Sequence, residues 1–79
     1  MQDEKEIILQ NERERGLIVF LHGDRFGFIR TGLDEQDMFF HEGGVLNYQF
    51  DDLREGMMVS FIRISKYDKV KAIAVEVVE

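Results

Sequence analysis

Two short runs of aromatic side chains are the part of this chain best suited to chemistry, and that chemistry is non-covalent. The runs read RFGFI at residues 25–29 and DMFFH at residues 37–41. Alternate side chains of a β-strand point to the same face, so each run presents two rings on one side. The four rings belong to Phe26, Phe28, Phe39 and His41. An exposed aromatic surface on a small protein needs a reason, and the stacking of unpaired nucleobases is a common one.

Gly27 indicates which face of the first run points outward. If the two phenylalanines of that run face solvent, Gly27 and Ile29 face the core. An inward glycine suits a strongly curved sheet, in which a Cβ would crowd the opposite wall. The same alternation places Met38 and Phe40 inside, and Phe61 is predicted to lie inside as well. The alternative is that all these rings form the core, because Phe is among the most often buried residue types.

The sequence offers little for catalysis or metal binding. There is no Cys, which excludes disulfides and thiolate ligands. His41 is followed by Glu42 and His22 stands alone, and neither has a recognised ligand spacing or a nucleophile beside it. We therefore expect no enzyme, no metal site and no cofactor.

Length and composition predict one small globular domain. The chain has 79 residues, 44% of them hydrophobic and 33% charged. A chain this short buries only about 60% of the surface that its unfolded form exposes, so the core will be thin. No apolar run approaches the roughly 20 residues of a transmembrane helix, and the charged start is unlike a signal peptide. We expect a cytoplasmic protein that does not contact a membrane.

Net charge argues against a polyanionic partner without excluding one. The formal net charge is −6 at pH 7, and such a field repels nucleic acid. Screening shortens electrostatic reach to about 8 Å at physiological salt, so local cations matter more than the total.

The rest of the chain predicts the strands that must position the rings. Strand-like segments alternate with turn signals, and no Pro interrupts them. These segments are residues 17–21, 26–30, 37–41, 57–64 and 70–78. In the last of them Ile73, Val75 and Val77 are predicted to share one face, alternating with Ala72, Ala74, Glu76 and Val78. Five short strands suggest an all-β closed barrel at residues 16–79. Residues 1–15 read as a charged N-terminal extension, either a tail or a short helix.

Four segments in order resemble the cold shock domain family. Residues 25–29 resemble its first ribonucleoprotein motif, and residues 37–41 resemble the second. Residues 50–61 match its Phe-x-x-Leu-x-Glu-Gly-x-x-Val-x-Phe segment, and residues 71–75 resemble its final strand. The resemblance implies a five-stranded antiparallel barrel of the oligonucleotide-binding (OB) fold that binds single-stranded RNA or DNA.

Carried over residue by residue, the resemblance implies a binding surface and a role. Stacking is implied for Phe20, Phe26, Phe28, Phe39, His41 and Phe50. Phosphate contacts need cations near that face, and Arg25 and Arg30 are the first candidates, with Arg54 and Lys71 as further ones. The implied function is that of a monomeric RNA chaperone or regulator without catalysis.

The departures from the family pattern favour a second interpretation. The family's first strand usually reads Lys-Trp-Phe-Asn, whereas residues 19–22 read VFLH, so a cation and an indole are missing. Arg25 replaces a Gly, and Glu42 stands where a further Phe is common. The turn after residues 19–22 is one residue shorter than in the family pattern. Similar shortened turns and missing Trp occur in the cold shock domains of the translational regulator called upstream of N-ras. The alternative function is a protein-interaction module that has lost most nucleic-acid affinity.

Overall fold

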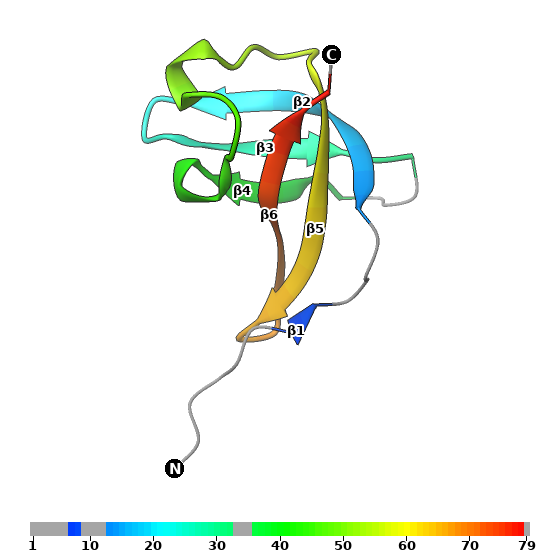
Figure 1. Cartoon of the computed structure of the whole chain (residues 1–79). Coiled ribbons are helices and arrows are strands. Elements are labelled where there is room, and N and C mark those ends of the chain that lie inside the picture. The colour runs from blue at the N-terminus through cyan, green and yellow to red at the C-terminus, as the bar shows by residue number, and fades with distance from the viewer. Residues whose placement is uncertain (1–6, 9–12, 33–35, 79) are drawn as a thin grey trace.

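A single sheet closes on itself to form a small barrel (Figure 1). The computed structural model describes residues 7–8, 13–32 and 36–78. Its strands are β1 (Ile7–Ile8), β2 (Glu14–His22), β3 (Phe26–Arg30), β4 (Met38–His41), β5 (Met58–Lys66) and β6 (Lys69–Val77). Two short 3₁₀ turns, η1 (Glu42–Gly44) and η2 (Phe50–Asp52), lie between β4 and β5. The predicted all-β barrel of five main strands is confirmed.

The strand order explains how the barrel closes. The sheet runs β1-β5-β2-β3-β4-β6, and β6 pairs again with β5. Neighbouring strands are antiparallel except β4 and β6, which meet in parallel where Phe39 lies opposite Lys71. The isolated parallel bridge between Val45 and Val75 continues that contact. A closed barrel leaves few free sheet edges, and in Figure 1 the β5–β6 hairpin projects beyond the barrel with β1 beside it.

The core contains the residues that the alternation placed inside. Ile29, Met38, Phe40 and Phe61 are all buried, as predicted. They pack with the other members of one cluster, which are Ile18, Leu53, Val59, Ala72, Val75 and Val77.

The structure also explains the glycine between the two phenylalanines of β3. A Cβ at Gly27 would lie 2.5 Å from the backbone oxygen of Phe20 and 2.9 Å from the ring of Phe40. Both distances are shorter than van der Waals contact, so any larger residue would force the backbone of β2 or a core ring to move. The inward glycine is therefore required by the approach of β2 and by the core ring of β4.

Two irregularities break the simple alternation of the longer strands. The register shifts in β2 between Ile18 and Phe20, and in β5–β6 between Ser60 and Ile62. Ala74 has φ +52°, and Val75 is buried whereas Ile73 is only half-buried. The expectation that Ile73 shares a face with Val75 and Val77 is therefore wrong. The extra residue of a bulge reverses which of the following side chains face the core. A prediction that assumes strict alternation along the whole strand misses this reversal.

The first described residues of the barrel form polar contacts with β5. The Glu14 carboxylate accepts two hydrogen bonds of 2.7 Å from the Arg63 guanidinium, and the two side chains are only 9% and 15% exposed. Arg13 donates to the hydroxyl and the carbonyl of Ser60, both at 2.9 Å. Strand β2 thus begins at Glu14, before the domain start predicted at residue 16.

Most of the predicted N-terminal extension lies outside the described residues. The exceptions are residues 13–15 and β1, whose Ile7 and Ile8 pair with Ser65 and Ile64. The division of the chain into residues 1–15 and 16–79 stays a prediction. The described residues include no helix with the length and apolar character that crossing a membrane requires.

Candidate nucleic-acid interface

Strands β2, β3 and β4 bring six aromatic side chains onto the outer side of the barrel. Phe28 lies opposite Phe20 on β2 and opposite Phe39 on β4, while Phe26 lies opposite His22 and His41. Side chains of directly opposed residues point to the same face of a sheet. We call this set the aromatic face, and its members are Phe20, His22, Phe26, Phe28, Phe39 and His41.

Ring-to-ring contacts hold the aromatic face together. The Phe28 ring centroid lies 6.0 Å from that of Phe20 and 6.1 Å from that of Phe39. Phe26 lies 5.6 Å from Phe39, and the His22 ring stacks on Phe26 at 4.6 Å with an interplanar angle of 12°. Aromatic pairs at these separations attract each other by about 0.5–1.5 kcal/mol beyond their burial. The rings are therefore preordered, so a ligand would not have to assemble them.

The exposure of these rings to solvent differs along the aromatic face. Phe26, Phe28 and Phe39 are half-buried because they cover one another, whereas Phe20 is 42% exposed and His41 is exposed. The prediction that these rings lie outside the core is confirmed. Their full exposure is not observed, because adjoining rings shield each other's edges.

His22 is a member that the sequence reading did not include. It follows Phe20 by two positions on β2, so the alternation applied to β3 and β4 would also have placed it on this face. Its Nδ1 accepts a hydrogen bond of 3.0 Å from the backbone N–H of Asp24. This bond holds the imidazole at the β2–β3 turn, where it stacks on Phe26.

Phe50 lies apart from the aromatic face. It comes from η2, and its ring is 6.2 Å from the core ring of Phe40. The Arg25 guanidinium carbon lies 5.5 Å from the Phe50 ring centroid, within the range of a cation–π contact. One side of Phe50 is therefore covered by the core and another by a cation of the same chain.

Arg25 is held by two carboxylates. Its guanidinium donates to Glu42 at 2.5 Å and to Asp51 at 2.8 Å. These hydrogen bonds raise the pKa of Arg25 above its ordinary value, and the one to Glu42 has the larger effect. The residue has φ +71°, a conformation that costs a residue with a Cβ about 1–2 kcal/mol. The contacts of its guanidinium with η1 and η2 offset that cost.

Arg30 is paired in a similar way. Its guanidinium donates to both carboxylate oxygens of Asp37, at 2.9 and 3.2 Å. The same hydrogen bonds raise the pKa of Arg30 and lower that of Asp37. The Arg30 side chain is exposed and that of Asp37 is partly exposed, so solvent screening leaves this pair with little effect on stability. The two cations predicted to contact phosphate thus already have anionic partners within the protein.

Arg54 and Lys71, the further candidates, differ in their surroundings. Arg54 donates to the backbone carbonyls of Asp51 and Leu53, at 2.9 and 2.7 Å. Lys71 lies opposite Phe39 in the β4–β6 pairing, so it borders the aromatic face. Within the described part of the chain, the Lys71 side chain makes no hydrogen bond or ion pair.

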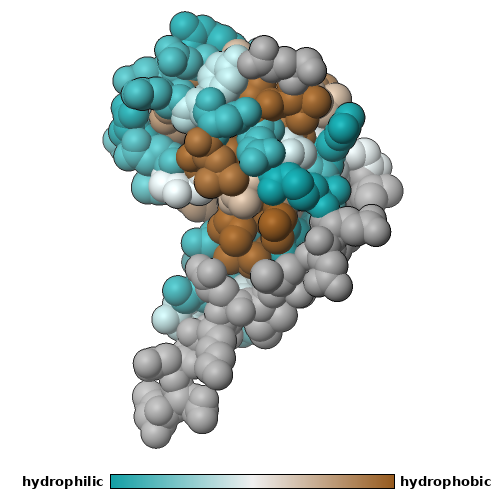
Figure 2. All heavy atoms as spheres, in the orientation of Figure 1, coloured by the Kyte–Doolittle hydropathy of each residue, from teal (hydrophilic) through white to brown (hydrophobic). Residues whose placement is uncertain are grey.

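Among the described residues there is no group of three or more His, Cys, Asp or Glu that could hold a metal ion. On the side shown in Figure 2, hydrophobic residues form separate patches on the barrel, with hydrophilic residues between them. The arrangement offers flat rings and hydrogen-bonding edges as its means of contact with a ligand.

One comparison with known proteins bears on this surface. The model of a family described as the 'Cold-shock' DNA-binding domain matches residues 14–78. The matched range begins with the first residue of β2 and includes every ring of the aromatic face. A search of curated proteins finds no match to the chain.

Proposed function

Because the chain belongs to the cold-shock domain family of nucleic-acid-binding proteins, we propose that its aromatic face binds single-stranded RNA or DNA by stacking unpaired bases. The observation that carries this proposal is the line of adjoining rings across β2, β3 and β4. Each stacked base contributes about 1–3 kcal/mol and every base has a flat face, so stacking tolerates many sequences. Such a domain would hold RNA unstructured, as an RNA chaperone or regulator without catalysis.

The pairing of the cations predicts an unusual dependence on salt. Binding of single strands weakens with salt in proportion to the number of phosphates that cations neutralise, with a slope of about −0.7 per phosphate. Arg25 and Arg30 are engaged by Glu42, Asp51 and Asp37. We therefore expect affinity to come mainly from stacking and to fall only gently as salt increases.

A titration tests the proposal. A labelled oligo-uridine or oligo-thymidine strand is mixed with the protein at low salt, and fluorescence anisotropy is followed. We expect saturable binding in the micromolar range or tighter, since several stacked bases at about 1–3 kcal/mol each must overcome the cost of ordering the strand. An unlabelled duplex of the same length should compete poorly, because its bases are not free to stack.

A protein-interaction module is the second candidate function. It is favoured by the net charge of −6 and by the carboxylates of Glu42 and Asp51 beside the candidate phosphate site. The same titration separates the two functions. The absence of any binding at tens of micromolar protein would reject nucleic-acid binding and favour this alternative.

Releasing Arg25 is expected to tighten binding. The double variant Glu42→Gln/Asp51→Asn removes both carboxylates that hold its guanidinium, so the cation becomes free to meet a phosphate. We expect affinity at low salt to rise about threefold to tenfold, and the salt slope to steepen by up to about 0.7 for one new phosphate contact. Anisotropy titrations at several salt concentrations measure both quantities.

The matched control for this variant is Asp52→Asn/Asp68→Asn. It makes the same change in net charge at two exposed carboxylates that do not contact Arg25. Its gain in affinity should be smaller and its salt slope nearly that of the wild type. If Glu42→Gln/Asp51→Asn instead weakens binding, the carboxylates position Arg25 and Phe50 for the ligand, and the idea that they suppress a cation is wrong.

A further inference from the structure

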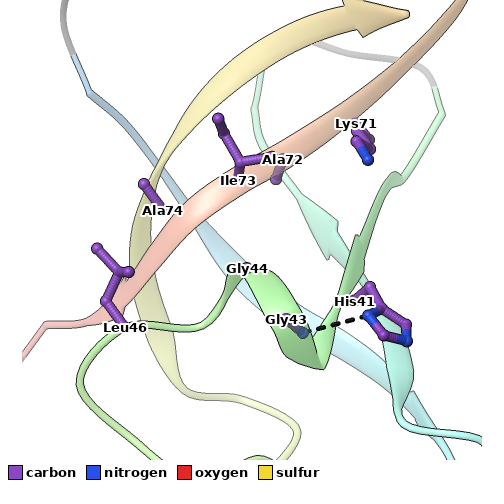
Figure 3. A pocket seen from close by; sticks show the side chains of 8 residues that line it. All are labelled: His41, Gly43, Gly44, Leu46, Lys71, Ala72, Ile73 and Ala74. Atoms are coloured by element: carbon purple, nitrogen blue, oxygen red, sulfur yellow. Dashed lines mark hydrogen bonds between the residues drawn. The ribbon is translucent and has the colours of Figure 1, made fainter. Parts of the chain in front are cut away.

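A pocket of about 390 Å³ lies beside the aromatic face, between η1 and β6 (Figure 3). The residues around it are His41, Gly43, Gly44, Leu46, Lys71, Ala72, Ile73 and Ala74. Sites for small ligands usually have volumes of about 300–1,000 Å³, so this space is large enough for one nucleotide-sized group. Gly44 lies close to β6 here, since a Cβ on it would be 3.5 Å from the Cα of Ile73.

The pocket has a polar end and an apolar end. Figure 3 shows His41 and Lys71 on one side of Gly44, and Leu46 with Ala74 on the other. Leu46 is 58% exposed, which leaves an apolar surface open to solvent. A nucleotide has the same division, because its base has apolar flat faces and its phosphate is anionic.

Among the described residues that border the aromatic face, Lys71 is a cation whose side chain has no carboxylate partner. Arg25 and Arg30 are each paired with carboxylates, whereas the Lys71 ammonium group has no ionic or hydrogen-bonding partner within the described residues. Its position opposite Phe39 puts it at the border between the aromatic face and the pocket. A phosphate between two bases, one on the aromatic face and the next in the pocket, would lie within reach of this ammonium group.

His41 supplies a second donor at the same border. Its Nδ1 accepts a hydrogen bond of 3.2 Å from the backbone N–H of Gly43. In a neutral imidazole whose Nδ1 is an acceptor, the proton is on Nε2, and Nε2 makes no hydrogen bond to another described residue. The bond to Gly43 also fixes the ring against η1.

We propose that the pocket between η1 and β6 is a subsite for one further nucleotide of the strand bound on the aromatic face. Its phosphate contacts Lys71 and the Nε2–H of His41, and its base lies against the apolar side formed by Leu46 and Ala74. This inference rests on the proposed function. The bound nucleic acid would then run from the aromatic face on β2, β3 and β4 onto β6. Its phosphate would be contacted by Lys71 in place of Arg25 and Arg30.

The first test uses charge and salt. In Lys71→Gln we expect affinity for oligo-uridine to fall about fivefold at low salt, and the salt slope to become shallower by about 0.7, the value for one phosphate contact. The control is Lys66→Gln, an equal charge change at the hairpin end, where Lys66 lies against the Tyr67 ring. The control should keep the wild-type slope. Equal slopes for the two variants would overturn the contact with Lys71.

The second test uses the apolar end. We expect the methyl NMR signals of Leu46 to shift when oligo-uridine is added to the wild-type protein. Leu46→Glu should weaken binding more than Val70→Glu, a change at a similarly exposed residue outside the pocket, which is 44% exposed. Unshifted methyl signals, or equal effects of the two glutamates, would overturn the subsite.

The outcomes distinguish this inference from the proposed function. If the wild type binds oligo-uridine and Phe39→Ala weakens it, while the pocket variants behave like their controls, the aromatic face binds the strand and the subsite is rejected. If the wild type does not bind at all, both proposals fail.

Discussion

Phe28→Ala/Phe39→Ala is expected to remove most of the affinity for single-stranded nucleic acid. These two rings occupy the middle of the aromatic face, and each contacts other rings of it. Losing two stacking platforms at about 1–3 kcal/mol each corresponds to at least about a thirtyfold increase in Kd. Anisotropy titrations against oligo-uridine, with circular dichroism to verify folding, measure this loss.

Tyr67→Ala is the matched control for this loss of rings. Tyr67 is 61% exposed at the turn of the β5–β6 hairpin, and its ring does not belong to the aromatic face. Its removal should change Kd by less than about twofold, within the small effect expected for an exposed residue away from the site. If both variants bind like the wild type, stacking on these rings does not provide the affinity, and the proposed function loses its main support.

The part of this fold that could be predicted from sequence is the part governed by local rules. The alternation around Gly27 depends only on strand geometry, and it placed Ile29 and Phe40 in the core correctly. The closed barrel followed from five short strands without Pro. The break at Ala74 could not be predicted in this way, because a bulge arises from the pairing of β6 with β5, and pairing partners are not visible in one strand.

The ion pairs of Arg25 could not be predicted either, because its partners lie far away in the sequence. Arg25 meets Glu42 and Asp51, which are 17 and 26 residues away in sequence. Sequence reasoning treated Glu42 as a departure from the family pattern, at a position where a further Phe is common. It did not foresee that the carboxylate would pair with the arginine predicted to bind phosphate. Lys71 gained importance only when the β4–β6 pairing placed it beside Phe39.

The largest effect on stability is expected from Phe61→Ala. Phe61 is fully buried on β5 within the main core cluster. Removing a core Phe leaves a cavity and costs about 3–5 kcal/mol, against the roughly 5–15 kcal/mol that stabilises a typical small protein. Phe28→Ala should cost less, because the Phe28 ring is half-buried on the outer face and leaves no enclosed cavity. Urea unfolding followed by circular dichroism gives both free energies of unfolding.

A milder core variant keeps this comparison measurable if Phe61→Ala does not fold. Phe61→Leu retains most of the apolar volume, so it should remain folded and cost less than Phe61→Ala. Phe28→Leu is its counterpart on the aromatic face and should cost less than Phe61→Leu, because solvent can fill the space beside a half-buried ring. The reverse order, with the Phe28 variants unfolding at lower urea than the Phe61 variants, would mean that the outer rings are the true core. The aromatic face would then be a structural element, and bases would have no preformed surface on which to stack.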